Sequence, residues 1–143
     1  MGSIILDTNV LSELMRPEPD QAVVEWFAER TGISFYVTAI TEAEILLGIA
    51  LLPAGKRRTT LTEAAETMFR MEFAGRCLPF DTICTAQYAA IVVGRRKAGL
   101  SITTEDAQIA SIALCNSHSL ATRNVKDFQQ IDGLMLLNPW DSQ

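Results

Sequence analysis

Short apolar runs alternate along the chain with longer segments in which apolar residues recur every three or four positions. The short runs have the length of buried strands, and the longer segments have the period of amphipathic helices. Strands that alternate with helices predict a mostly parallel sheet covered on both faces, so we expect an α/β fold, a three-layer α/β/α sandwich. The expected strands are Ile4–Leu6, Ser34–Val37, Cys77–Phe80, Ser119–Thr122 and Leu134–Leu137.

Helical periodicity fills the segments between these strands. Pro17 and Pro19 interrupt the first helical region, because proline disrupts the hydrogen bonding of a helix interior, and Pro53 ends a later one. Asp20 and Asp81 precede helical segments and are expected to cap them. The expected helices are Val10–Met15, a segment after Asp20 that carries Val23, Val24, Trp26 and Phe27, then Ile40–Leu52, Leu61–Phe73, Ile83–Ala98 and Glu105–Cys115.

Length and composition favour a single domain. A chain of 143 residues can bury one core, so we expect one domain over residues 1–143. A hydrophobic fraction of 48% is high for a small protein and indicates apolar surface reserved for a partner. The longest apolar stretch, Ile45–Leu52, is too short to cross a membrane, and the N-terminus lacks a signal-peptide pattern. We therefore expect a cytoplasmic protein without a membrane partner.

Charge and cysteine spacing exclude some kinds of site. The net charge of −5 argues against a protein that binds nucleic acid by bulk electrostatics, although local groups of cations could still contact phosphates. The cysteines form no C-x-x-C pair and lie in apolar patterns, so reduced buried thiols are expected rather than a disulfide or a zinc site. The groups of cations, each also typical of a solvated helix end or loop, are Lys56–Arg58, Arg95–Lys97, and Arg123 with Lys126.

Three carboxylates lie where ligand chemistry is expected. Asp7 directly follows the first strand, and in doubly wound sheets ligands gather at the C-terminal ends of the central strands. Glu44 and Asp106 lie near the N-terminal ends of helical segments. Each can also be the acidic member of a capping box, begun by Thr41 in "TEAE" and by Thr103 in "TTED". Together with Asp7, their positions favour convergence on one pocket.

Carboxylates that converge repel one another, which raises their pKa values, and a divalent cation removes that cost. Mg²⁺ or Mn²⁺ suits such oxygen ligands and keeps waters for a phosphate substrate. The single histidine, His118, lies in a polar turn and is expected at the surface, and neither a Walker glycine loop nor a G-x-S-x-G motif is present. If the chain is an enzyme, we expect a metal-activated water that attacks phosphorus.

Five segments carry a resemblance to a known family. They are "ILDTNVLSEL", "TEAEILLGI", "GLSITTEDAQIASIA", "LATRNVKDF" and "LNPW". In this order they closely resemble the PIN-domain family, in particular the VapC-like and FitB-like toxins of bacterial type II toxin–antitoxin systems. The resemblance implies a small α/β/α endoribonuclease that needs Mg²⁺ or Mn²⁺, hydrolyses RNA, and is held inactive by a cognate antitoxin. It matches Asp7, Glu44 and Asp106 to the family's first three metal-site acids.

The family's fourth acid has two candidates here. Many members carry an aspartate near the end of the fourth strand, where this chain has Asn124, and Asp127 follows one turn later. Asn124 could coordinate or bind water without bringing charge, whereas Asp127 could supply the charge or merely cap a short turn. The polar neighbours Thr8, Asn9 and Thr122 could orient the carboxylates or their waters, or else cap the helix after Asp7 or close a turn.

The resemblance also implies partners. Toxins of this kind usually form homodimers, receive an antitoxin segment in an apolar groove, and reach operator DNA only through the antitoxin. An antitoxin arginine that reached Asp7, Glu44 and Asp106 would block metal binding. Helical spacing aligns several apolar residues that could form the groove, and two or three of them should be exposed in the isolated chain. The candidates are Leu11, Leu14, Met15, Trp26, Phe27, Leu47 and Leu51.

Two other functions fit parts of the sequence. An aspartyl phosphotransferase or phosphatase would use Asp7 as its nucleophile, but Asn9 stands where its second acid is expected. A non-catalytic module of the toxin fold would act only with its antitoxin on operator DNA. Metal-dependent RNA cleavage supports the nuclease, a trapped phosphoaspartate supports the phosphotransferase, and the absence of both supports the module.

Overall fold

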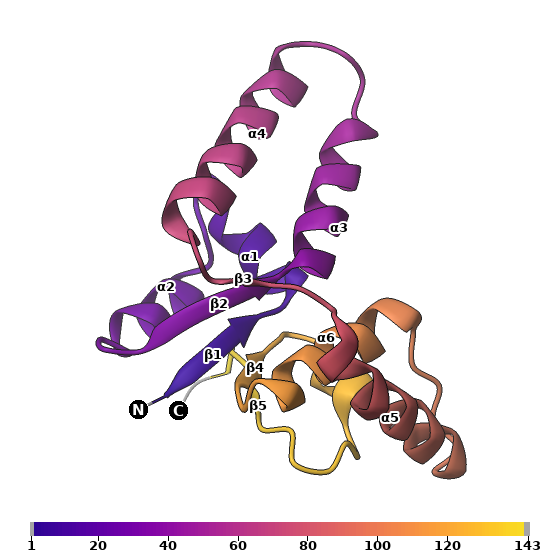
Figure 1. Ribbon diagram of the computed structural model, residues 1–143. Helices are drawn as coiled ribbons and strands as arrows, with labels where there is room; N and C mark the ends of the chain where they lie inside the picture. Colours follow the sequence, from indigo (N-terminus) through magenta and orange to yellow (C-terminus); the bar gives the residue numbers. More distant parts are fainter. Residues whose placement is uncertain (1, 142–143) are drawn as a thin grey trace.

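A computed structural model describes residues 2–141 of the chain. Figure 1 shows a central sheet with helices on both sides, and two helices, α3 (Ala39–Ala50) and α4 (Lys56–Thr67), that extend side by side away from it. Within the described residues, no helix is both long enough and apolar enough to span a bilayer.

Within residues 2–141, five parallel strands form the sheet in the order β3-β2-β1-β4-β5. Strand β1 is central, with Ile5 opposite Tyr36 of β2 and Leu120 of β4. The chain builds outward from β1 to β3 on one side and then from β4 to β5 on the other, so the strand order reverses between β1 and β4. The strands are β1 (Ser3–Leu6), β2 (Ser34–Thr38), β3 (Cys77–Leu78), β4 (Ser119–Ala121) and β5 (Leu136–Leu137).

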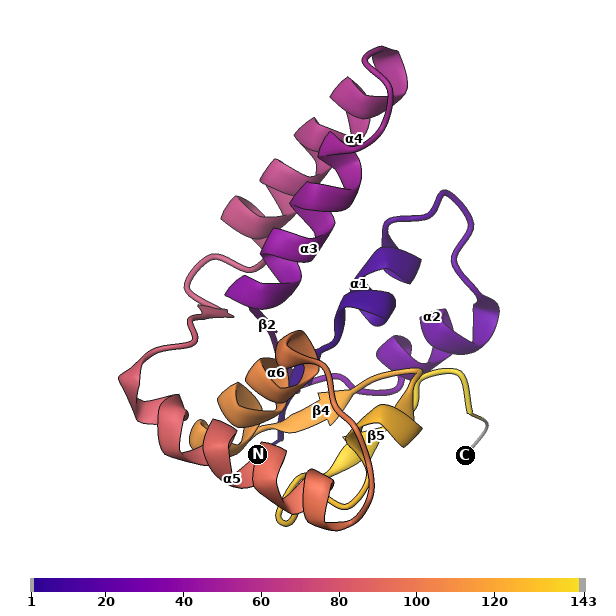
Figure 2. The ribbon, with the colours of Figure 1, turned by 90° about the vertical axis from the view of Figure 1, so that its right-hand side faces the viewer.

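Alternate residues of β1 supply two hydrophobic cores. Ile4 and Leu6 pack in the core that includes α1 and α2, whereas Ile5 packs in the core of α5 and α6. In Figure 2, α5 and α6 lie together on one side of the strands, apart from α1 and α2. The expected three-layer α/β/α sandwich is confirmed, and its sheet is fully parallel. The remaining helices are α1 (Thr8–Leu14), α2 (Gln21–Ala28), α5 (Thr85–Lys97) and α6 (Thr104–Cys115), joined by the short turns η1 (Met68–Glu72), η2 (Thr82–Cys84) and η3 (Val125–Phe128).

The expected cap of α2 is confirmed, and the expected cap at Asp81 is wrong. The carboxylate of Asp20 accepts the backbone N–H of Ala22 at 2.9 Å. Asp81 precedes η2 but makes no side-chain cap: its Oδ1 faces Sγ of Cys84 at 3.8 Å and accepts no backbone N–H, and α5 begins only at Thr85.

The helix expected at Leu61–Phe73 begins and ends at other residues in the structure. Helix α4 already begins at Lys56, after Gly55, whose φ of 153° only glycine adopts readily. Its first turn reads "KRRTT" and lacks apolar residues, so hydrophobic periodicity could not reveal it. After Thr67 the chain widens into the π-helical turn η1.

Cys77, Cys84 and Cys115 are all free thiols, as expected. Cys84 is buried and the other two are half-buried. Burial raises the pKa of Cys77 to about 12 and that of Cys115 to about 11. These shifts favour the protonated, unreactive thiol.

Arg95 does not belong to an exposed group of cations, because its side chain is buried. It is 4% exposed, and its guanidinium donates to the backbone carbonyls of Ser101, Lys126 and Gln129. The bond to Gln129 measures 2.7 Å. Arg95 therefore ties the loop before α6 to η3.

Arg95→Met should keep the apolar stem of the side chain but leave these carbonyls without their charged donor. We expect the free energy of unfolding to fall by about 2–4 kcal/mol in urea denaturation. The exposed neighbour Arg96 supplies the control, since Arg96→Met should change it by less than about 0.5 kcal/mol. Equal losses in the two variants would show that Arg95 does not hold η3 in place.

Candidate active site

Asp7 lies one residue beyond β1, at the C-terminal end of the central strand, and is 5% exposed. Its backbone N–H donates to the carbonyl of Ala121 at 2.9 Å, so pairing with β4 continues past the strand. The chain then turns directly into α1, and Oδ1 of Asp7 accepts the backbone N–H of Thr8 at 2.9 Å. The carboxylate is thereby fixed at the junction of a strand and a helix.

The second oxygen of Asp7 is held by side chains from other segments. The Thr122 hydroxyl, just after β4, donates to Oδ2 at 2.7 Å. The side-chain amide of Asn9 lies 3.4 Å from Oδ2 and donates weakly to it, while the Asn9 carbonyl oxygen accepts the backbone N–H of Arg123 at 3.1 Å. Asn9 and Thr122 thus orient Asp7, one of the two roles that the sequence left open for them.

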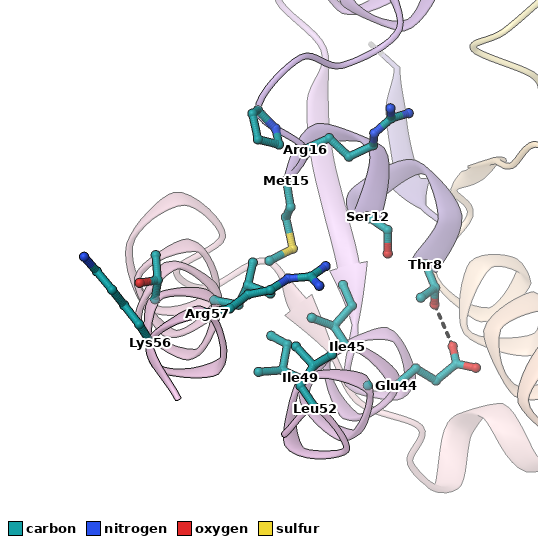
Figure 3. A pocket seen from close by; sticks show the side chains of 14 residues that line it. Thr8, Ser12, Met15, Arg16, Glu44, Ile45, Ile49, Leu52, Lys56 and Arg57 are labelled. Atoms are coloured by element: carbon teal, nitrogen blue, oxygen red, sulfur yellow. Dashed lines mark hydrogen bonds between the residues drawn. The ribbon is translucent and has the colours of Figure 1, made fainter. Parts of the chain in front are cut away.

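Glu44 reaches the same region from α3. Its Oε1 accepts a hydrogen bond of 2.6 Å from the Thr8 hydroxyl, which Figure 3 shows as a dashed line. The capping-box interpretation of Glu44 is wrong, because Thr38 caps α3 by accepting the N–H of Thr41 at 3.1 Å. Glu44 therefore lies within the helix with its side chain directed to the residue next to Asp7.

Asp106 lies in the first turn of α6, where part of its capping box is present. The Thr103 hydroxyl accepts the backbone N–H of Asp106 at 3.1 Å. The Asp106 carboxyl is half-buried and is influenced by the charges of Asp7, Asp127 and Glu44. A cap and a place in the acidic group are thus compatible at this residue.

The pKa values show that these carboxylates share one electrostatic environment. Burial raises the pKa of Asp7, the hydrogen bonds that it accepts lower it, and the charges of Glu44 and Asp127 raise it further. Burial also raises the pKa of Asp106 to about 6, with further contributions first from Asp7 and then from Asp127. No lysine or arginine among residues 2–141 counters either shift.

Asn124 and Asp127 differ in what they bring to this site. The backbone N–H of Asn124 donates to the Thr122 hydroxyl at 3.1 Å, and its exposed side chain makes no hydrogen bond with residues 2–141. Asp127 makes no side-chain cap of η3, while its charge raises the pKa values of Asp7 and Asp106. Of the two, Asp127 is the residue that adds negative charge.

The oxygen donors of this group suit a hard divalent cation such as Mg²⁺ or Mn²⁺. Among residues 2–141, no three carboxylate, histidine or cysteine side chains already lie close enough to hold an ion together. Asp127 is exposed and Asp106 is half-buried, so their side chains can rotate, whereas hydrogen bonds fix the carboxylate of Asp7 and hold one oxygen of Glu44. Binding of an ion would therefore gather the mobile acids around Asp7.

His118 lies away from this group, directly before β4. Its ring stacks on Tyr36, with 4.5 Å between ring centroids, and its Nδ1 contacts the hydroxyl of Ser3 in β1. Burial lowers its pKa. It is half-buried rather than fully at the surface, and it is not positioned to act as a general base for this site.

A pocket of about 900 Å³ opens beside Glu44, between α1, α3 and α4. Figure 3 shows Thr8 and Glu44 at one end of it and Lys56 at the other, with the side chain of Arg57 reaching from that end across the pocket toward Ile45. Its apolar lining includes Met15, Ile45, Ile49, Leu52 and Leu61.

Of the residues expected to form an apolar groove, only Met15 lines this pocket. Leu47 and Leu51 lie outside the lining and are 60% and 76% exposed, which confirms that two of the set are exposed. Leu11 and Trp26 are buried in the core. Leu11, Leu14 and Phe27 line a second pocket of about 470 Å³ instead, so the expected residues do not share one pocket. Helix α3 turns Ile45 and Ile49 toward α4, and Leu47 away from it.

Comparison with known proteins gives consistent matches over nearly the whole chain. The PIN domain family matches residues 4–134. The VapC ribonuclease Y4jK of Sinorhizobium fredii is 40% identical over 138 residues, which cover 96% of this chain and 98% of that protein. Toxin FitB of Neisseria gonorrhoeae is 42% identical over 137 residues, which cover 96% and 98% respectively. A structure of FitAB bound to a DNA fragment matches with a TM-score of 0.88 and 40% identity, covering 98% of this chain and 97% of that one.

The raised pKa of Asp106 predicts how stability changes with pH. Because this pKa is higher in the folded protein than in the unfolded chain, the folded state gains the proton first as pH falls. In the presence of a chelator, the contribution of Asp106 to the free energy of unfolding should therefore increase between about pH 7 and about pH 5. Thermal melts should show this gain in the wild type and a smaller gain in Asp106→Asn.

Glu105→Gln provides the control, since Glu105 is an exposed neighbour on the same helix. Its melts should follow the wild-type pH dependence. If Asp106→Asn shows the same dependence as the wild type, the Asp106 carboxyl does not share the repulsion of the acidic group.

Proposed function

The chain belongs to the PIN-domain family, and on that premise we propose that it is a metal-dependent endoribonuclease that acts as the toxin of a type II toxin–antitoxin system. The observation that carries the proposal is the group of carboxylates near the end of β1, in which the charges of Glu44 and Asp127 raise the pKa values of Asp7 and Asp106. The names of its relatives, a VapC ribonuclease and a toxin, support RNA as substrate and the role of toxin.

In this proposal Asp7, Glu44 and Asp106 hold Mg²⁺ or Mn²⁺, and Asp127 adds negative charge. The bound ion supplies a Lewis acid for phosphate oxygens and lowers the pKa of water. The hydroxyl of Thr122 and the amide of Asn9 keep the Asp7 carboxylate in one orientation.

Glu44 is suited to accept a proton from the attacking water. Its Oε1 is held by the Thr8 hydroxyl, while its Oε2 accepts no hydrogen bond from residues 2–141. The side chain is exposed beside the pocket, where water reaches it. A carboxylate that is held at one oxygen and free at the other can take up a proton without losing its position.

The structure gives less support to an aspartyl phosphotransferase. Both oxygens of Asp7 already accept hydrogen bonds, from Thr8 and from Thr122. Among residues 2–141, no lysine donates to this carboxylate to offset the charge of a transferred phosphate. The non-catalytic module is the remaining alternative, and the absence of RNA cleavage by active, folded protein would favour it.

The proposed nuclease should cleave RNA with Mg²⁺ or Mn²⁺ and stop in chelator. Asp7→Asn should lower the cleavage rate by orders of magnitude, while its melting temperature without metal equals or exceeds that of the wild type, because one member of a repelling set is neutralised. Mn²⁺ should stabilise the wild type by about 2.7 kcal/mol at a hundredfold excess over Kd, and the variant much less. Cleavage and thermal melts with chelator and with Mn²⁺ measure both effects.

The control for this test is Glu25→Gln, which removes a carboxylate on α2 that contributes to neither raised pKa. This variant should retain both cleavage and the response to Mn²⁺. Full cleavage in chelator would refute the metal mechanism. An equal increase in melting temperature with Mn²⁺ in all three proteins would show that Asp7 does not bind the ion.

We also propose that a segment of the cognate antitoxin occupies the pocket between α1, α3 and α4. Its apolar wall suits apolar side chains, and Glu44 at one end suits an arginine. Lys56 at the other end, and Arg57, which reaches from that end across the pocket, suit acidic side chains of the same segment. Operator DNA would be reached through the antitoxin. Leu47 on α3 and Leu51 directly after it are exposed and available to a second copy in a homodimer.

Gly48 allows this proposal to be tested without changing a polar contact. It lines the pocket, and an added Cβ would meet no atom within 4 Å. Gly48→Leu should fill the pocket, leave RNA cleavage unchanged, and weaken inhibition by the cognate antitoxin about tenfold or more. The measurement is a titration of cleavage with purified antitoxin.

Gly94→Leu is the matched control. Gly94 lies in α5, an added Cβ there would also meet no atom within 4 Å, and the residue does not line the pocket between α1, α3 and α4. Both substitutions should raise helix stability by roughly 0.5–1 kcal/mol. Inhibition that stays unchanged in Gly48→Leu would place the antitoxin elsewhere.

A further inference from the structure

The proposed substrate is a polyanion, whereas this chain has a net charge of −5 and an acidic site. Phosphates on either side of the cleaved bond need cations to position them. Several arginines already have partners within the chain. Arg95 donates to buried carbonyls, Arg76 donates to the carbonyl of Phe35, and Arg16 pairs with Glu13 at 3.1 Å.

Arg123 differs, because its backbone adjoins the residues that hold Asp7 while its side chain is not paired to an acid among residues 2–141. It directly follows Thr122, which holds Asp7, and its backbone N–H donates to Asn9 at 3.1 Å. Its side chain is exposed and makes no ion pair or hydrogen bond with residues 2–141. It does not lower the pKa of Asp7 or of Asp106.

The ring of Trp140 holds the Arg123 guanidinium in place. The guanidinium carbon lies 4.8 Å from the ring centroid, a cation–π contact. Trp140 comes from the segment after β5, and its backbone N–H donates to the Asn138 side chain at 3.0 Å. The indole also packs against the core, so it forms a fixed support rather than a mobile one.

The two residues meet because β4 and β5 are neighbours. The backbone N–H of Thr122 donates to the carbonyl of Leu137 at 2.8 Å, which extends this pairing past both strands. The segments that leave the sheet at this edge therefore bring Arg123 and Trp140 together, one residue after Thr122, whose hydroxyl donates to Asp7.

We propose that Arg123, supported by Trp140, binds a backbone phosphate of the RNA substrate beside the acidic site. A guanidinium that stacks by one face keeps its N–H donors free at the edge, where they can reach two phosphate oxygens. Such a contact positions the strand and does not read its sequence. The inference rests on the proposed function, since it assigns a role toward the same RNA.

Binding can be measured apart from cleavage in an Asp7→Asn background with chelator. The probe is a short fluorescein-labelled single-stranded RNA, followed by anisotropy over a range of salt concentrations. Adding Arg123→Gln should weaken binding about 3- to 10-fold and reduce the slope of log K against log salt by about 0.7, the value for one phosphate on a single strand. Arg123→Lys, which keeps the charge but not the planar fork, should lose less affinity and keep the slope.

Arg96→Gln is the matched control, because it removes an exposed cation from the end of α5. It should leave affinity and slope close to those of the background. Losses as large in Arg96→Gln as in Arg123→Gln would overturn the inference, since the effect would then be one of overall charge. An unchanged slope in Arg123→Gln would also overturn it.

Kinetics separate this inference from the proposed function. With Asp7 intact and Mn²⁺ present, Arg123→Gln should raise KM while kcat changes little, because the contact is the same in the ground and transition states. A wild type that cleaves RNA with no change of KM in Arg123→Gln would refute the inference alone. A folded wild type that neither cleaves nor binds RNA would refute the proposed function.

Discussion

The burial of the Asp7 carboxylate at the end of the central strand is the constraint on which the site depends. A buried carboxylate is costly unless it accepts hydrogen bonds, and Asp7 accepts them from the backbone of Thr8 and the hydroxyl of Thr122. These donors belong to the start of α1 and the end of β4, so the need to satisfy one side chain fixes the junction of a helix and two strands. Even so, burial keeps the pKa of Asp7 raised, and the charges of Glu44 and Asp127 raise it further.

Groups of different chemistry surround this carboxylate in separate places. The acids of α3, α6 and η3 contribute like charge, which a bound cation would offset. The apolar pocket adjoins Glu44, and the cation of Arg123 stands beyond Thr122 at the end of β4. In our account the acids hold the cation that RNA cleavage needs. The pocket binds the antitoxin segment, and Arg123 binds the RNA backbone.

Local patterns were sufficient to predict the fold and to point to three acids whose charges interact in the structure. Asp7 follows a buried strand, and the sequence around it already indicates that position. The cap of α3 was missed because Thr38 ends a strand and resembles a strand residue, whereas Thr41 stands in a plausible capping motif. Likewise, the packing of α3 on α4 decides that Ile45 rather than Leu47 lines the pocket. Arg95 can be buried because backbone carbonyls of other segments, such as that of Gln129, accept its guanidinium N–H groups. These misses depend on contacts between segments that no local pattern contains.

The central claim is that Asp7 and the other acids gather around a divalent cation, and a crystal soaked in Mn²⁺ tests it most directly. Anomalous diffraction locates manganese without reference to any activity. Our account predicts a peak bound by the carboxylates of Asp7 and Asp106, with Glu44 or Asp127 turned toward it. A well-ordered site without a peak there, or manganese bound only elsewhere on the molecule, would contradict it.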